Sequence, residues 1–288
     1  MGPLPTPIVS TEWLAAHLEE PGLVVVDASW YLPAMQRDAR AEYAAAHLPG
    51  AIFWDIDALS DRQSPFPHML PDPGTLGRQI GELGIGNADR VVVYDGSGIN
   101  LSAPRVWWTL RTAGHDAVAV LDGGLGRWRA EGRPLASGVE RREPARFAVR
   151  FRPELVRSEA QVLSAIASRG AQLLDARSRG RFEGSEPEPR PGLRGGHLPG
   201  ARSLPFQELV DQRGLLHQRA ELLRRFTAAG IDPSKLTVTS CGSGVTACSL
   251  ALGLELIGAA GYAVYDGSWS EWGRAQGPPI EQGPPVSS

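Results

Sequence analysis

The feature that most constrains this chain is an internal repeat. Five short motifs of the first half recur in the same order in the second half, displaced by 144 to 150 residues. The clearest is His-Leu-Pro-Gly-Ala, which begins at His47 and again at His197. Ordered matches at a nearly constant offset indicate a tandem duplication. The 288 residues are therefore expected to form two similar domains of about 130 residues each.

Each copy alternates short apolar runs with helical patterns. The runs include Leu23–Asp27, Arg90–Asp95 and Gln172–Asp175, and each ends in an acidic residue. Continuous short apolar runs are typical of strands buried on both sides, and alternation with helices is typical of parallel sheets. The sequence therefore predicts an α/β fold in which each domain is a mainly parallel sheet with helices on both faces.

The joint between the copies is expected where proline, glycine and arginine accumulate. This stretch contains Arg133-Pro, Ser137-Gly, Glu143-Pro and Arg152-Pro. The predicted division is a first domain over 1–135, a linker over 136–156 and a second domain over 157–288. The last 14 residues hold four prolines and two glycines, so they are expected to be disordered or to lie over the surface.

Composition excludes several classes of protein. The formal charge of −3 gives no reason to expect a nucleic-acid partner, and no apolar run approaches the ~20 residues that span a bilayer. The amino terminus lacks the pattern of a signal peptide, so a cytoplasmic location is expected. The two cysteines, Cys241 and Cys248, are too far apart on one helix for a disulfide, and no residues have zinc-ligand spacing. No metal or other cofactor is expected.

The residues around Cys241 carry the chemistry. Thr237–Ser240 favours a strand, two glycines and a serine follow Cys241, and an apolar run begins at Ala247. That order predicts strand, tight loop and helix, with backbone N–H groups and the helix dipole directed at the thiol. Such surroundings lower the pKa of a thiol and favour the nucleophilic thiolate. The alternative is a buried structural cysteine beside a glycine-rich turn.

The first copy has Asp95 where the second has Cys241. An aspartate cannot perform thiolate chemistry, so only the second copy is expected to be catalytic. The first copy is expected to supply structure and one wall of a cleft. Its extra polar residues, from Asp55 to His68, suggest a function facing the partner domain, although a solvated loop would have the same composition.

These motifs together resemble the tandem rhodanese-type sulfurtransferases. The resemblance rests on the loop that begins at Cys241, on Asp175-Ala-Arg with its following arginines, on the repeated His-Leu-Pro-Gly-Ala, and on Asp266-Gly-Ser-Trp-Ser-Glu-Trp. It covers about Ser10 to Arg274 and implies two rhodanese-like domains. Cysteine phosphatases share this fold but need an arginine six residues after the cysteine, where this chain has Ala247.

Within the family, the residues after the cysteine separate the subtypes. Thiosulfate-preferring members usually carry basic residues there, whereas this chain has Gly242 and Ser243. The resemblance therefore implies a 3-mercaptopyruvate sulfurtransferase, in which Cys241 becomes a persulfide and pyruvate leaves. The acceptor would be a thiol, such as that of thioredoxin, or cyanide, and the protein a monomer. A thiosulfate sulfurtransferase is the main alternative, and a non-catalytic rhodanese-like binding module is a remote one.

The resemblance also implies roles for individual residues. Arg181 and Arg190 correspond to the ligands of the substrate carboxylate and carbonyl. Ser243, His68 and Asp57 correspond to a proton relay, in which Asp57 is preferred to the nearby Asp61 on the motif alone. The remaining substrate-binding residues lie in the cysteine loop and are Gly242, Gly244, Val245 and Thr246. Cys248 is expected to be a buried apolar residue, with redox regulation as an alternative.

Overall fold

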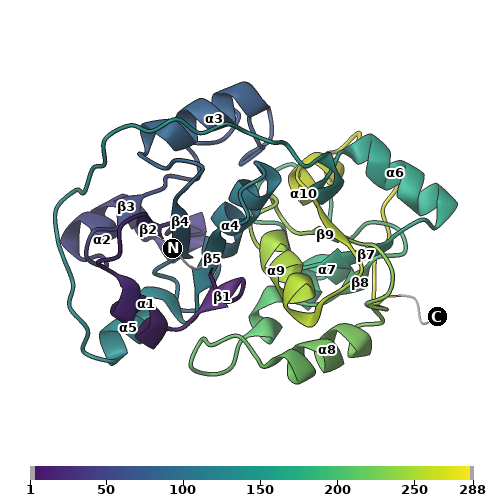
Figure 1. Ribbon diagram of the computed structural model, residues 1–288. Helices are drawn as coiled ribbons and strands as arrows, with labels where there is room; N and C mark the ends of the chain where they lie inside the picture. Colours follow the sequence, from purple (N-terminus) through teal and green to yellow (C-terminus); the bar gives the residue numbers. More distant parts are fainter. Residues whose placement is uncertain (1–3, 286–288) are drawn as a thin grey trace. The chain divides into compact units, whose positions relative to one another are not determined.

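The computed structural model describes residues 4–285, which form two compact units. The first unit holds most of the chain up to Arg152, and the second holds most of the chain from Pro153 onward. Residues 1–3 of the predicted first domain and residues 286–288 of the predicted second domain lie outside the described residues. Each unit contains one five-stranded sheet and five α-helices among the described residues (Figure 1).

The sheet of the first unit is entirely parallel, with strand order β1-β5-β4-β2-β3. Right-handed crossovers in opposite directions along this order place α1, α2 and α5 on one face and α3 and α4 on the other. The strands are β1 Ile8–Val9, β2 Leu23–Asp27, β3 Ile52–Phe53, β4 Arg90–Tyr94 and β5 Val118–Leu121. The helices are α1 Thr11–His17, α2 Ala39–Ala45, α3 Pro73–Glu82, α4 Ala103–Thr112 and α5 Gly124–Ala130, with a 3-10 turn at Pro33–Met35.

The second unit repeats this architecture, with strand order β6-β10-β9-β7-β8 and parallel pairing throughout. The predicted α/β fold, with two similar domains of parallel sheets and helices, is confirmed. The strands are β6 Val156–Arg157, β7 Gln172–Asp175, β8 Arg202–Ser203, β9 Thr237–Ser240 and β10 Tyr262–Tyr265. The helices are α6 Glu159–Ser168, α7 Arg179–Glu183, α8 Arg219–Ala228, α9 Ala247–Ile257 and α10 Ser268–Trp272, with 3-10 turns at Pro153–Leu155 and Phe206–Leu209.

The order of the second sheet determines where a site can form. From β7 the chain moves to one neighbouring position, β8, and from β9 it moves the other way, to β10. The carboxyl ends of β7 and β9 therefore flank a topological switch point, where open α/β sheets place their ligand sites. Asp175 and Ser240 are paired at these two ends, so the loop that begins at Cys241 starts at this point.

The proline- and arginine-rich stretch after the first domain is bound along the first unit. Its backbone N–H groups at Ala145 and Arg150 donate to the carbonyls of Gly81 and Ala113, each near the end of a helix. The side chain of Phe147 is buried. The carbonyls at a helix end have no partner within the helix, and the irregular stretch supplies N–H donors to two of them. Residues up to Arg152 therefore belong to the first unit.

Each unit also includes one short segment from the other half of the chain. Gln63–Met69 belongs to the second unit, and Val210–Leu216 belongs to the first. The two segments start 147 residues apart, so they occupy equivalent positions in the duplication. The N–H of Leu216, for example, donates to Oδ1 of Asp122 at 2.9 Å. The second half therefore contributes a hydrogen-bonded segment to the first unit.

The carboxyl-terminal stretch lies along the second unit as far as it is described. Its backbone at Glu281 exchanges two hydrogen bonds with His197, and the indole N–H of Trp272 donates to the carbonyl of Pro279 at 2.9 Å. The sequence left open whether the tail is disordered or lies over the surface. As far as it is described, it lies over the surface of the second unit.

Candidate active site

Cys241 directly follows β9 and is buried, with 2% of its surface exposed. Its backbone N–H donates to Oγ of Ser268 at 3.1 Å, and its carbonyl accepts from the N–H of Trp269 at 2.9 Å. The loop turns at Gly244, which has φ of +75°, and α9 begins at Ala247. The predicted order of strand, tight loop and helix is confirmed, and residues that follow β10 fix the backbone of Cys241.

Two arginines converge on the residue after the cysteine. A methyl group built on Gly242 would lie 3.0 Å from Nη2 of Arg181 and 3.8 Å from Nη1 of Arg190. Arg181 comes from α7, which follows β7, and its side chain is 19% exposed. Two guanidinium groups beside a nucleophile provide charged donors for an anionic or carbonyl-bearing substrate. The structure therefore brings both predicted arginines to the loop.

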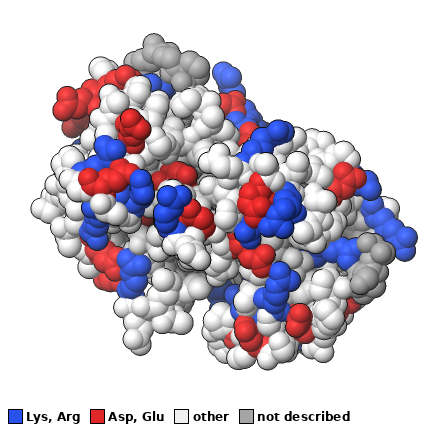
Figure 2. All heavy atoms as spheres, turned by 90° about the horizontal axis from the view of Figure 1, so that it is seen from below, with Lys and Arg blue, Asp and Glu red and all other residues white. Residues whose placement is uncertain are grey.

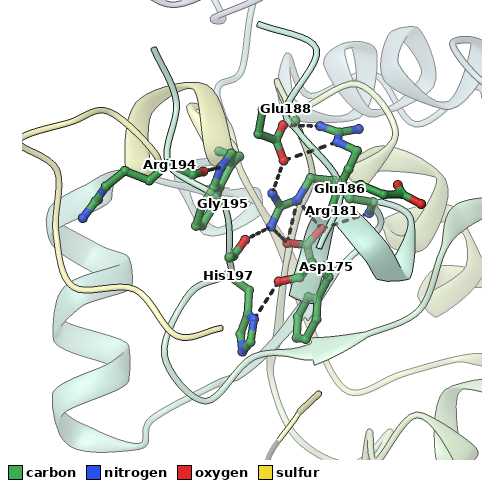
Figure 3. Close-up of polar contacts among 12 residues, drawn as sticks. Asp175, Arg181, Glu186, Glu188, Arg194, Gly195 and His197 are labelled. Carbon is green, nitrogen blue, oxygen red and sulfur yellow. Dashed lines mark hydrogen bonds and ion pairs between the residues drawn. The ribbon is translucent and has the colours of Figure 1, made fainter. Parts of the chain in front are cut away.

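Two charged residues complete this part of the site and were not predicted as functional. Glu188 accepts from both Arg177 and Arg181, and Arg177 also forms an ion pair with Asp175. Figure 3 shows the carboxylate of Glu188 joined to the guanidinium of Arg181. Arg177 and Glu188 lie between Asp175 and Arg190, within a motif that carries the family resemblance. Their place in that motif is the sequence signal from which a functional role could have been predicted. The sequence gives no means of pairing them across an irregular loop.

Ser243 and His68 form the second predicted constellation. Both side chains are buried, and Nδ1 of His68 lies 2.9 Å from Oγ of Ser243. His68 belongs to the exchanged segment Gln63–Met69, and its backbone has φ of +63°. A left-handed conformation is unusual for a non-glycine residue and occurs where surrounding contacts impose it. The exchanged segment thus delivers a histidine to the loop that carries Cys241.

Asp57, the third member of the predicted relay, belongs to the first unit. Its side chain is exposed, and its Oδ2 accepts from the indole N–H of Trp30 at 3.2 Å. A role for Asp57 in a relay with His68 remains a prediction.

The remaining loop residues differ in how they are placed. Val245 is buried with 2% exposure, whereas Thr246 is half-buried at the cap position of α9. Sγ of Cys248 donates to the carbonyl of Gly244 at 3.2 Å from within the buried face of the helix. Neither cysteine forms a disulfide. Cys248 therefore stabilises the turn of the loop through its hydrogen bond to the Gly244 carbonyl.

The equivalent loop in the first unit contains its own anion. The buried carboxylate of Asp95 accepts from the backbone N–H groups of Ser97, Ser102 and Ala103, each at 2.9 Å, and from the Ser97 hydroxyl. Ala103 is the first residue of α4, as Ala247 is of α9. The loop of the first unit therefore presents backbone donors to a negative charge at the residue that directly follows its strand.

Neither a cluster of metal-ligand side chains nor a membrane-spanning helix is found among residues 4–285. Within 4–285, no three His, Cys, Asp or Glu side chains are grouped as metal ligands would be. None of the described helices is both long and apolar enough to span a bilayer. Basic and acidic side chains are intermixed on the face shown in Figure 2, and Arg224 and Arg225, for example, both pair with Glu221.

Comparisons with known proteins identify the family of the chain. The model of the rhodanese-like domain matches residues 10–131 and 158–275, so the chain belongs to the rhodanese family, in two tandem copies. Human 3-mercaptopyruvate sulfurtransferase is 46% identical over 92% of this chain and 91% of its own length. Bovine thiosulfate sulfurtransferase is 43% identical over 92% and 91%.

Among solved structures, SseA from Escherichia coli, a 3-mercaptopyruvate sulfotransferase, superimposes with a TM-score of 0.84 and is 40% identical. The alignment covers 92% of this chain and all of that one. The predicted membership of the tandem rhodanese-type sulfurtransferases is confirmed.

Proposed function

We propose that the protein is a sulfurtransferase that moves sulfur from 3-mercaptopyruvate, through a persulfide on Cys241, to a thiol or to cyanide. The observation that carries the proposal is the convergence of Arg181 and Arg190 on Gly242, next to the buried nucleophile. A 2-oxo acid presents a carboxylate and a carbonyl oxygen side by side, and two guanidinium groups can bind both. The names of the related proteins support the same class of reaction.

In the first step, the Cys241 thiolate attacks the sulfur of the donor. The new S–S bond forms as the C–S bond breaks, and its electron pair stays on carbon as the enolate of pyruvate. One proton converts this enolate to pyruvate. Ser243 and His68 are joined by a hydrogen bond beside the cysteine and serve as its source.

In the second step, an acceptor removes the outer sulfur of the persulfide. A thiolate acceptor, such as that of thioredoxin, becomes a persulfide, and cyanide becomes thiocyanate. In both cases the Cys241 thiolate is regenerated and no net oxidation occurs. Backbone donors of the loop stabilise the sulfur anion, as they stabilise the Asp95 carboxylate in the first unit.

Replacement of the nucleophile tests this proposal. Cys241→Ser is expected to abolish sulfur transfer and to leave the fold intact, because a serine hydroxyl stays protonated and cannot form a persulfide. Mass spectrometry of the wild type after donor treatment should show one added sulfur on the peptide that contains Cys241. An adduct found on Cys248 alone, or turnover by the serine variant, would refute the assignment.

The choice of donor is tested separately on the wild type. Mercaptopyruvate is expected to exceed thiosulfate in kcat/KM by at least about tenfold, or 1.4 kcal/mol. The reason is that Gly242 and Ser243 add no cation to the loop for a doubly charged donor. A preference for thiosulfate would leave the sulfurtransferase activity standing and would identify the alternative subtype.

A further inference from the structure

We propose that Glu188 determines the donor specificity of this site by fixing Arg181 and by reducing the positive charge that meets the substrate. The inference rests on the proposed function, since it concerns the choice between two sulfur donors. Glu188 is itself an anion beside a site for anionic substrates, and its carboxylate would oppose their binding unless it had another role.

The carboxylate of Glu188 joins two arginines. Its Oε1 accepts from Nη1 of Arg177 at 2.7 Å, and its Oε2 accepts from Nη2 of Arg181 at 2.6 Å. Nε of Arg181 also donates to Oε1 at 3.3 Å, so the carboxylate binds one edge of that guanidinium in a fork. The side chain of Glu188 is only 2% exposed. Figure 3 shows this bridge between Glu188 and the edge of Arg181 formed by Nε and Nη2.

Arg177, which holds Glu188 in place, is itself immobilised. Its side chain is fully buried, forks onto Asp175 at the end of β7, and donates to the carbonyl of Gly196 at 2.8 Å. Its guanidinium also lies 4.2 Å from the centre of the Trp269 ring. Glu188 is therefore anchored to a strand of the sheet, although it comes from an irregular loop. Because Glu188 is held in place, its hydrogen bonds also hold the guanidinium of Arg181 in place.

The position of Arg181 is tied to the loop as well as to Glu188. Its Nη2, the atom bound by Oε2 of Glu188, is the atom that a methyl group on Gly242 would approach to 3.0 Å. A guanidinium without its carboxylate partner could swing away from the loop into solvent, since long arginine side chains lose considerable entropy when fixed. Because Glu188 orders Arg181 before the substrate arrives, substrate binding does not have to supply the entropy cost of ordering this side chain.

The charges in this cluster match a singly charged donor. Glu188 pairs with Arg181 and Arg177, and Arg177 also pairs with Asp175, so the Glu188 carboxylate lowers the positive charge beside Gly242 by one unit. The 2-oxo acid has one carboxylate, whereas thiosulfate carries two negative charges. A lower positive charge therefore favours mercaptopyruvate over thiosulfate.

The test is Glu188→Gln, compared with Glu186→Gln as a matched control. Glu186 lies two residues away on the same loop, is exposed, and accepts from the Ser178 hydroxyl. Glu188→Gln is expected to lower kcat/KM for mercaptopyruvate at least tenfold, mainly through KM, and to keep or raise kcat/KM for thiosulfate. The ratio of the two donors should fall at least tenfold, whereas the control should leave it unchanged.

A second variant covers the case in which Glu188→Gln does not fold. Glu188→Asp keeps the charge but shortens the reach to Arg181, so KM for mercaptopyruvate should rise without any gain in thiosulfate turnover. Equal losses on both donors in Glu188→Gln, or an unchanged KM for mercaptopyruvate in Glu188→Asp, would overturn the proposal. The wild-type donor ratio and the Cys241 adduct are measured first, so failure of the proposed function is recognised independently of Glu188.

Discussion

At the scale of single residues, the two copies differ sharply at the carboxylate that ends the second strand of each unit. Asp175 is paired with the buried Arg177, whereas Asp27 accepts from the backbone N–H of Ser29, the residue at the position equivalent to Arg177. Burial raises the pKa of Asp27 above its usual range, and the nearby Asp95 carboxylate adds to the effect. The first copy thus retains a buried acid whose arginine partner is absent.

The raised pKa of Asp27 predicts how stability depends on pH. The folded state binds this proton more tightly than the unfolded state, so the contribution to the free energy of unfolding is greatest below the usual value of about 3.8. It is lost as pH rises through the folded pKa. Asp27→Asn should remove this loss and stabilise the protein at pH 8, as measured by urea unfolding.

The same variant should be nearly neutral at the acid end of the folded range, because asparagine resembles the protonated acid. A matched comparison is Asp175→Asn, which leaves the buried Arg177 with less compensation and should destabilise the protein at pH 8. Stabilisation by Asp175→Asn, or a constant effect of Asp27→Asn across pH, would contradict this account.

Residue identities that carry chemistry were largely predictable. Cys241, Arg181, Arg190 and the Ser243–His68 pair could be placed in the site from motifs, because the chemistry restricts each to one or two residue types. Glu188 could not, since its role depends on Arg177 lying within 2.7 Å across a loop without regular structure.

At the scale of elements, the loop of Cys241 depends on the segment that follows β10. Ser268 is fully buried with φ of +48°, and its hydroxyl accepts from the Cys241 N–H while donating to the carbonyl of Tyr265 at 2.7 Å. The short helix α10 therefore serves to position the nucleophile. The sequence marked this motif as part of the family pattern without assigning it a role.

Ser268→Ala should destabilise the protein by about 1–3 kcal/mol, because the buried N–H of Cys241 loses its acceptor. We also expect a lower kcat, since the thiol is held less firmly. Thermal unfolding and steady-state kinetics with mercaptopyruvate measure the two effects.

Ser270→Ala provides the comparison within the same helix. Its hydroxyl donates to the carbonyl of Gly242, but that carbonyl also accepts from the backbone N–H of residue 270 and stays satisfied without the hydroxyl. Ser270→Ala should therefore lower stability and kcat clearly less than Ser268→Ala does. Equal effects of the two substitutions would mean that the hydroxyl of Ser268 has no special role.

The positions of helices and strands were predictable because burial and periodicity are local. Helix α4 begins at Ala103 and includes Pro104, since proline is tolerated in a first turn, where its missing N–H costs nothing. The exchanged segment Gln63–Met69 was partly predictable, since the polar residues from Asp55 to His68 suggested a function facing the other domain. The reciprocal segment Val210–Leu216 was not, because no periodicity distinguishes a loop that packs on its own unit from one that packs on the other.

At the scale of the whole molecule, neither half of the chain contains a complete unit. A fragment of residues 153–288 lacks Gln63–Met69, so Ser243 loses His68. Its kcat for mercaptopyruvate should be at least about tenfold below that of the intact chain, because a positioned proton donor contributes about 10²–10⁴-fold. Mixing it with a fragment of residues 1–152 should restore part of the activity.

Circular dichroism of each fragment establishes that it is folded before activity is compared. A folded fragment of residues 153–288 with the kcat of the intact chain would contradict the role assigned to the exchanged segment. A mixture no more active than the second fragment alone would show that the two halves do not reassemble after separation.

The carboxylate of Asp95 has a consequence for how the duplicated chain is maintained. The anion of this loop is a side chain of the loop itself, and three backbone N–H groups donate to it. The loop of the first copy therefore needs neither a substrate nor a sulfur adduct to satisfy these donors. This copy can keep its folded loop without taking any part in sulfur chemistry.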